Sequence, residues 1–217
     1  MSETLNLTPD ELLTTTRSVR KRLDLDRPVP LELVKECVEI ALQSPSASNR
    51  QHWHFVVVTD AEQRATIGDY YGRSFAEYAE SKSAAGNLYA DDPERAAVQE
   101  RVGDSASYLA GVMGKVPVLV IPCIDSGSAE LPAANQSGLW GSIVPAAWSY
   151  MLAARARGLG SAWTTLHQKF EREIGELLGI PETVHQAALL PTAYFTGETF
   201  RPAKRQPLDE VLHVNGW

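Results

Sequence analysis

The residues best suited to chemistry in this chain are two arginines and a hydroxyl near the N-terminus. Arg17, Ser18 and Arg20 follow a short predicted helix, and the two arginines stand three residues apart. On a helical turn this spacing would place both guanidinium groups on one face, with Ser18 nearby. Guanidinium groups offer paired, planar donors to phosphate oxygens, so the segment is a candidate phosphate-binding site.

A second basic cluster lies near the C-terminus, at Arg201, Lys204 and Arg205. The 217-residue chain is otherwise acidic, with a formal net charge of −7, which argues against a nucleic-acid or anionic-membrane surface. Two small basic clusters in an acidic chain could meet on a single anion such as a phosphate. Two separate, solvated basic faces explain the same pattern.

A polar loop that leads into a buried strand is a second candidate for ligand contact. Residues 44–51 read Ser-Pro-Ser-Ala-Ser-Asn-Arg-Gln and are small, polar and turn-forming. The apolar, β-branched run 55–58 that follows is typical of a buried strand. Such a loop can present hydroxyl, amide and free backbone groups to a planar polar ligand. An ordinary helix–loop–strand connection is the alternative.

The elements that must position these residues are helices alternating with a few apolar strands. Thr8, Pro9 and Glu11 predict a helix start through an N-cap, a first-turn proline and a capping box. Further helices are predicted over 31–43, from Asp60 to about 71, over 138–157 and over 171–178. Apolar runs predict strands over 55–59, 116–124, 161–166 and 187–195. No Gly-x-Gly-x-x-Gly follows a strand, so a Rossmann domain is disfavoured and a single α/β or α+β domain is predicted.

Domain organisation follows from what interrupts this pattern. No Gly/Ser-rich or Pro-rich linker divides residues 1–217, so we predict one domain. Residues 72–112 form a weakly periodic helical segment that could cover a site or be a surface excursion, and residues 197–217 form a basic, Pro-containing tail. Helix 138–157 is apolar on nearly every face, which places it in a core or an oligomer interface.

Several functional classes are disfavoured by what the sequence lacks. The chain opens with a polar, acidic segment and contains no apolar run of the length of a membrane span, so we expect a cytoplasmic protein that does not contact membranes. Cys37 and Cys123 occur in apolar patterns and are predicted to be small buried hydrophobes. His52 and His54 have no third ligand nearby, so no metal site is predicted.

Taken together, these pieces resemble the FMN-dependent nitroreductase family. The family opens with Arg-Arg-Ser-x-Arg, and residues 16–20 read Thr-Arg-Ser-Val-Arg. It continues with Pro-Ser-x-x-Asn-x-Gln-Pro-Trp-x-Phe, and residues 45–55 read Pro-Ser-Ala-Ser-Asn-Arg-Gln-His-Trp-His-Phe. A Gly-Leu-Gly after the long helix, a Leu-Gly-Ile-Pro turn and a basic tail also match. Thr16 and His52 depart from the family pattern, and Thr16 removes one expected phosphate contact.

The resemblance implies a three-layer fold with a mainly antiparallel central sheet surrounded by helices, assembled as an intertwined homodimer. It implies that the flavin phosphate is held by Thr16, Arg17, Ser18, Arg20, Lys204 and Arg205. It implies that the partner subunit reaches the flavin through Pro45, Ser46, Ala47 and Asn49. Backbone amides of Thr165 and Leu166 would lie near the isoalloxazine N5.

The activity implied by the resemblance is an NAD(P)H-dependent reduction of nitroaromatics, quinones or similar small acceptors, with NADH or NADPH as donor and ping-pong kinetics. The hydride chemistry belongs to FMN, so no side chain is expected to act as an obligatory acid or base. A specialised reaction within the family (enone reduction, dehalogenation or flavin fragmentation) is one alternative. A flavin-binding protein without turnover is another.

Overall fold

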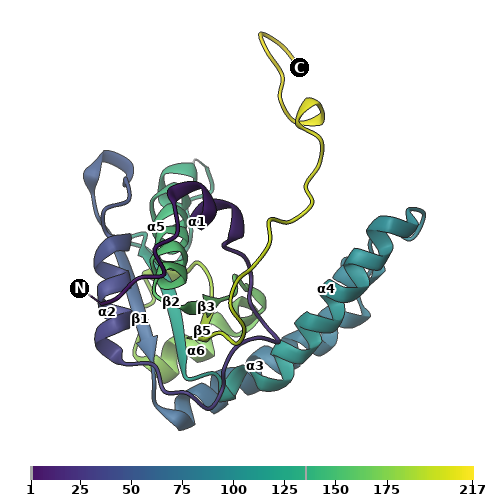
Figure 1. Ribbon diagram of the computed structural model, residues 1–217. Coiled ribbons are helices and arrows are strands. Elements are labelled where there is room, and N and C mark those ends of the chain that lie inside the picture. Colours follow the sequence, from purple (N-terminus) through teal and green to yellow (C-terminus); the bar gives the residue numbers. More distant parts are fainter. Residues whose placement is uncertain (1, 135) are drawn as a thin grey trace.

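The computed structural model describes residues 2–134 and 136–217 and shows helices packed around a central sheet (Figure 1). The helices are α1 (Pro9–Thr15), α2 (Leu31–Ala41), α3 (Ala61–Glu80), α4 (Pro93–Val112), α5 (Ser137–Ala156) and α6 (Glu171–Leu178). The strands are β1 (Trp53–Val58), β2 (Val118–Asp125), β3 (Leu159–Ser161), β4 (Val184–Gln186) and β5 (Leu190–Tyr194). Short 3₁₀ helices cover Ala47–Asn49 and Leu166–Phe170, among others.

The sheet is antiparallel at each of its pairings, as predicted. The strand order is β1-β2-β5-β3, and β4 also pairs with β2. Strand β2 therefore lies between β1 on one side and β4 and β5 on the other. The three-residue strand β4 was not predicted, because it is too short to show a periodicity.

Side-chain alternation on β2 divides the core into two layers. Val118 and Val120 pack with buried residues of α2 and α5, whereas Leu119 and Ile121 pack with buried residues of α3, α4 and α6. Successive strand side chains point to opposite faces, and here both faces are covered by helices. The predicted three-layer arrangement is confirmed.

Local signals fix several helix ends. The Thr8 side chain accepts a hydrogen bond from the Glu11 amide while the Glu11 carboxylate accepts one from the Thr8 amide, so the predicted capping box is present. The Asp60 side chain caps α3 by accepting hydrogen bonds from the Glu62 and Gln63 amides. Gly179 ends α6 in the left-handed region at φ 67°, a conformation that glycine adopts without a steric penalty.

Two predicted boundaries are wrong. Helix α3 continues past residue 71 to Glu80, and α4 lies beside it, so most of residues 72–112 is helical. Together α3, α4 and the linking residues 81–92, which we call the arm, project from the body (Figure 1). The strand predicted over 161–166 instead covers Leu159–Ser161 and is followed by a 3₁₀ helix.

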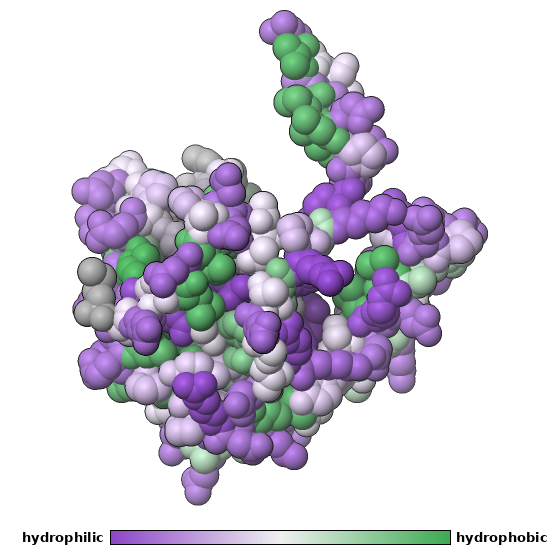
Figure 2. Space-filling model, in the orientation of Figure 1, coloured by the Kyte–Doolittle hydropathy of each residue, from purple (hydrophilic) through white to green (hydrophobic). Residues whose placement is uncertain are grey.

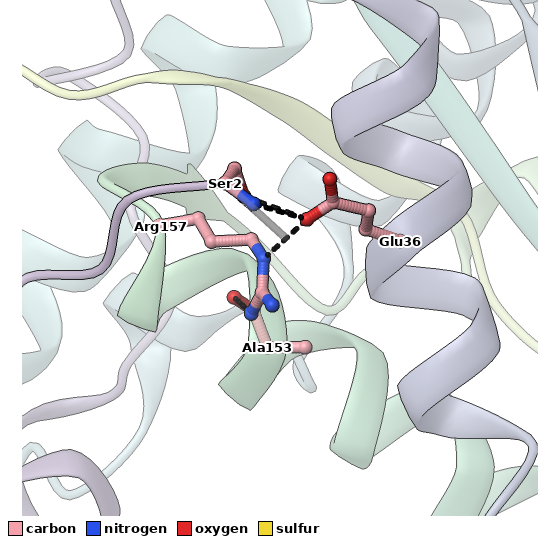
Figure 3. A network of polar contacts seen from close by, with 4 residues as sticks. All are labelled: Ser2, Glu36, Ala153 and Arg157. Atoms are coloured by element: carbon pink, nitrogen blue, oxygen red, sulfur yellow. Dashed lines mark hydrogen bonds and ion pairs between the residues drawn. The ribbon is translucent and has the colours of Figure 1, made fainter.

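An N-terminal network ties the first residues to the body (Figure 3). The Glu36 carboxylate accepts hydrogen bonds from the Ser2 amide (2.9 Å) and hydroxyl (2.7 Å). It also forms an ion pair with Arg157 Nε (3.3 Å). Arg157 also donates to the Ala153 carbonyl. The hydrogen bonds from Ser2 lower the pKa of Glu36 to about 2, against an opposing effect of burial.

The C-terminal tail is anchored to the body at its beginning. Arg22 donates to the Thr196 and Thr199 carbonyls, at 2.6 and 2.9 Å, and lies 4.1 Å from the centre of the Phe200 ring. Figure 2 shows the tail crossing from the body to the arm above an open gap and then extending away with apolar groups exposed. The most exposed apolar side chains there are Leu208, Val211, Leu212, Val214 and Trp217.

Candidate functional site

The segment 16–20 is extended, which corrects the expected helical turn. Helix α1 ends at Thr15, and the chain then runs alongside β3, where Ser18 forms a β-bridge with Ser161. The Val19 amide donates to the Ser161 carbonyl at 2.8 Å. Because side chains alternate along an extended segment, Arg17 and Arg20 do not share a face.

The two arginines of this segment bind different partners. Arg17 Nη1 donates to the Arg201 carbonyl at 3.0 Å, and Arg20 Nη1 donates to Ser105 Oγ of α4 at 3.3 Å. Neither forms an ion pair with a carboxylate among the described residues. Burial lowers the pKa of Arg20, and the charge of Arg17 lowers it further. Two neighbouring cations without a carboxylate partner fit the chemistry of a phosphate site.

Thr16 contributes no free donor to this site. Its hydroxyl donates to the Leu12 carbonyl at 2.6 Å, and the side chain is buried. The hydroxyl is thus used to complete the end of α1. The departure from the family pattern at this position therefore leaves Arg17, Ser18 and Arg20 as the polar members of the motif.

The C-terminal cluster reaches the N-terminal one only in part. Arg201 meets Arg17 through its carbonyl, but Lys204 Nζ lies 2.8 Å from a carboxylate oxygen of Glu94 on α4. A hydrogen bond to Glu94 and the charge of Glu94 raise the pKa of Lys204. Arg205 is exposed. In this structure Lys204 therefore joins the tail to the arm.

Thr165 and Leu166, the residues predicted to lie beside the flavin ring, follow strand β3, and the phosphate segment 16–20 runs alongside the same strand. Thr164 exchanges backbone hydrogen bonds with Leu189, which fixes the chain immediately before Thr165. The amides of Thr165 and Leu166 open the 3₁₀ helix and have no hydrogen-bond acceptor among the described residues. Two free amides at this position can donate to a ligand.

Tyr71 of α3 connects the two halves of this site and was missed from the sequence. Burial raises its pKa, while the nearby Thr164 side chain and the charge of Arg20 oppose that rise. Tyr71 therefore lies near both groups. Nothing in the sequence pattern of α3 distinguishes Tyr71 from a core aromatic, because its ring is also part of the main apolar cluster.

His167, on the same 3₁₀ helix, is also a finding of the structure. It is fully buried, and neither ring nitrogen has a hydrogen-bond partner in the part of the chain that the structure describes. Burial lowers its pKa to about 3, so the imidazole is neutral at physiological pH. A single histidine two residues beyond Thr165 gives no sequence signal for such burial.

The loop 44–51 carries unusual backbone geometry. Ser48, Asn49 and Gln51 adopt φ of 53°, 52° and 51°, the left-handed region that non-glycine residues rarely occupy. The Ala47 amide donates to Ser142 Oγ of α5 at 3.0 Å, and Ser46 Oγ accepts from the Gln51 amide at 3.1 Å. Pro45 and Asn49 are exposed. Clustered strain of this kind is typical of functional sites.

One chain does not bring this loop to the phosphate segment. The loop lies beside α2 and α5, whereas residues 16–20 lie beside β3, and no hydrogen bond joins the two among the described residues (Figure 1). Two surface hollows, of about 860 and 560 Å³, are lined by residues of other regions. In the described part of the chain, no group of His, Cys, Asp and Glu could hold a metal ion. No described helix has the length and apolar character of a membrane span.

Comparison with known proteins adds an independent observation. The Nitroreductase family profile matches residues 13–194. A Thermus thermophilus protein named NADH dehydrogenase is 32% identical over 199 residues, covering 90% of each chain. A Methanothermobacter thermautotrophicus protein with the provisional name NADH dehydrogenase/NAD(P)H nitroreductase is 28% identical, covering 95% of this chain and 86% of its own length.

Solved structures share the fold at lower identity. The FMN- and NADPH-dependent nitroreductase NfnB from sphigopyxis sp. strain HMH superposes with a TM-score of 0.71 at 24% identity, covering 97% of this chain and all of the other. Iodotyrosine deiodinase bound to FMN and 3-iodo-L-tyrosine superposes with a TM-score of 0.70 at 21% identity, covering 96% and 98%. With the profile match over most of its length and the Thermus relative, this chain belongs to the nitroreductase family.

Proposed function

We propose that this protein is an FMN-dependent oxidoreductase that takes electrons from NADH or NADPH and passes them to small acceptors such as nitroaromatics or quinones. The observation that carries the proposal is that one region holds two arginines without a carboxylate partner among the described residues, Arg17 and Arg20, and the amides of Thr165 and Leu166, which have no described acceptor. These groups suit the two ends of a flavin mononucleotide, a phosphate and a polar ring edge. The relatives named above for NAD(P)H and FMN support the same cofactors.

The residues present fit the cofactor by chemistry. Arg17, Ser18 and Arg20 supply donors for a phosphate. The amides of Thr165 and Leu166 supply donors for a ring nitrogen, and they are already oriented by the paired Thr164 backbone. When bound, FMN supplies the capacity to accept and donate a hydride. The protein's part is therefore to bind, orient and shield, and no side chain is assigned as acid or base.

We propose that a second copy of the chain completes the site through the loop 44–51. In one chain the loop is separate from the phosphate segment, although its backbone is strained and its Asn49 side chain is exposed. Two apolar side chains on α5, Val144 and Trp148, are 39% and 37% exposed and stand four residues apart on one helix face. The apolar end of the tail also lacks a covering surface. A homodimer would bury all of these groups.

The function is tested by the visible absorbance of the purified protein, recorded without oxygen before and after NADH or NADPH is added. Flavin bands that bleach on addition support the proposal. A colourless protein that takes up no added FMN overturns it. Bound FMN with no NAD(P)H oxidation in the presence of any acceptor would instead indicate a flavin-binding protein without turnover.

The shared site is tested by mixing two variants that each lack one half. Arg20→Ala removes a phosphate donor, and Asn49→Ala removes the partner-side amide. If the site is built from two chains, a mixture that exchanges subunits recovers FMN binding, because the mixed dimer holds one intact site. A mixture that binds no more FMN than the separate variants contradicts the two-chain site. An acceptor screen of the wild-type protein distinguishes nitro reduction from enone reduction or dehalogenation.

A further inference from the structure

The arm contacts residues 165–170, the segment that begins with the Thr165 and Leu166 amides, through an aromatic stack. Phe170 closes the 3₁₀ helix Leu166–Phe170, and its ring stacks on Tyr70 of α3 with centroids 4.9 Å apart and an interplanar angle of 27°. The Arg73 guanidinium lies 4.5 Å from the Phe170 centroid and 5.6 Å from that of Tyr70. Stacked rings with a nearby cation form a directional contact beyond simple burial.

An ion pair adds a third contact between the same two elements. Lys169, the neighbour of Phe170, pairs with Glu77 of α3. Tyr70, Arg73 and Glu77 stand at positions i, i+3 and i+7, which lie on one face of a helix. Both partners of the ion pair are exposed, so it contributes little by itself. The stack is therefore the main attachment.

The same segment is also held from the side of the sheet. Gln168 Nε2 donates to the Gln186 carbonyl at 2.8 Å, which holds the segment from the sheet side. His167 is fully buried, but its ring nitrogens make no hydrogen bond among the described residues. The Thr164–Leu189 backbone pair fixes the chain before the Thr165 and Leu166 amides, and the contacts from α3 hold it on their other side.

We propose that Tyr70 and Arg73 of the arm are positioning residues for the Thr165 and Leu166 amides, acting through Phe170. The inference rests on the proposed flavin function, since it assigns these amides to the ring end of the cofactor. A change in α3 at this face therefore alters cofactor binding and reduction potential without touching the cofactor. The arm thereby influences the electron-transfer properties of the site in addition to any contact with acceptors.

The test compares substitutions that remove or keep the Tyr70 ring. Tyr70→Leu removes the stack while retaining apolar volume, and Tyr70→Phe retains the ring. Phe75→Leu is the matched control, because Phe75 is a partly buried aromatic of α3 that pairs with Tyr78 instead of with residues 166–170. Each variant is measured for FMN dissociation constant by fluorescence, for the reduction potential of bound FMN, and for hydrogen exchange over residues 165–170 in the cofactor-free protein.

The expected result is specific to the lost stack. Tyr70→Leu should weaken FMN binding at least fivefold, make the reduction potential more negative as the amides move, and speed exchange over 165–170. Tyr70→Phe and the control should stay within twofold of the wild type in affinity. The inference is overturned if Tyr70→Leu and Phe75→Leu give equal changes, or if Tyr70→Leu leaves exchange and affinity unchanged.

Failure of the proposed function would look different. A wild-type protein that binds no FMN removes the cofactor readouts but leaves the exchange measurement, which decides whether Tyr70 orders residues 165–170. If Tyr70→Leu does not fold, Arg73→Gln removes the cation above the two rings from an exposed position and is read out in the same three ways.

Discussion

A single methyl group at residue 160 should displace the phosphate-binding segment. An ideal Cβ built on Gly160 lies 3.0 Å from Val19 Cβ and Cγ1 and 3.2 Å from Cγ2. Ordinary carbon–carbon contacts are about 3.5–4.0 Å, so Val19 must retreat by a few tenths of an ångström in Gly160→Ala. The Val19 amide is bonded to Ser161, and its neighbours Ser18 and Arg20 move with it.

The size of the effect follows from the crowding. Overpacking a well-packed core costs about 1–3 kcal/mol. A shift of the donors by this distance weakens charge-assisted hydrogen bonds to a phosphate, and we expect FMN affinity to fall about tenfold, equivalent to about 1.4 kcal/mol. Fluorescence titration measures the affinity, and thermal unfolding of the cofactor-free protein measures the stability, at about 2–4 °C per kcal/mol for a chain of this size.

Two comparisons separate crowding from a general effect of the substitution. Gly111→Ala on α4 adds a Cβ that meets no atom within 4 Å, so it should be neutral or stabilise by up to about 1 kcal/mol. Removing the Val19 methyl groups in a Val19→Ala, Gly160→Ala double variant should restore part of the affinity lost in Gly160→Ala, because Val19 Cγ1 and Cγ2 are removed while Cβ remains. If Gly160→Ala alone binds FMN and melts as the wild type does, the reasoning about this contact is refuted.

Three further predictions follow from burial and hydrogen bonding. Glu36 has a pKa of about 2 in the folded protein against 4.5 in the unfolded chain, so its stabilisation is complete above pH 4.5 and is lost as pH falls toward 2. Over this window the melting temperature should therefore fall more steeply with falling pH in the wild type than in Glu36→Gln, and equal slopes would refute this. Burial raises the pKa of Cys37 to about 11 and of Cys123 to about 12, so a disulfide reagent should label the native protein only as fast as it unfolds, and two thiols reacting within minutes would contradict this. An ideal Cβ built on Gly68 lies 2.5 Å from the Gly114 amide nitrogen, so Gly68→Ala should lower the free energy of unfolding, measured in urea, by about 3 kcal/mol. An unchanged urea midpoint would show that the two backbone segments can move apart at this point.

The elements that could be predicted from the sequence are those with local signals. The capping box at Thr8 and Glu11 and the stop at Gly179 depend on neighbouring residues, and both are present. Strand β2 is a long apolar run and was also predicted. In contrast, β4 was missed because three residues show no period, and its pairing with β2 is a long-range contact.

The sequence named the candidate site only as a set of residues, and the arrangement of those residues comes from the structure. The spacing of Arg17 and Arg20 predicted a shared helical face, whereas the hydrogen bond from the Val19 amide to the Ser161 carbonyl holds the segment extended. That bond joins residues more than a hundred positions apart, which no local pattern can reveal. The roles of Tyr71 and Phe170 likewise depend on how α3 packs and not on residue type.

The strained backbone at residues 48–51 lowers the stability of the folded chain, so substitutions there could raise it. Each left-handed non-glycine residue there costs on the order of 1 kcal/mol relative to a relaxed backbone. Glycine at Ser48 or Gln51 would relieve the steric part of that cost, although it adds flexibility to the unfolded chain. A protein engineer who sought only a higher melting temperature would therefore begin at this loop, and in doing so would change the backbone on both sides of Asn49, which we propose reaches the cofactor of a second subunit.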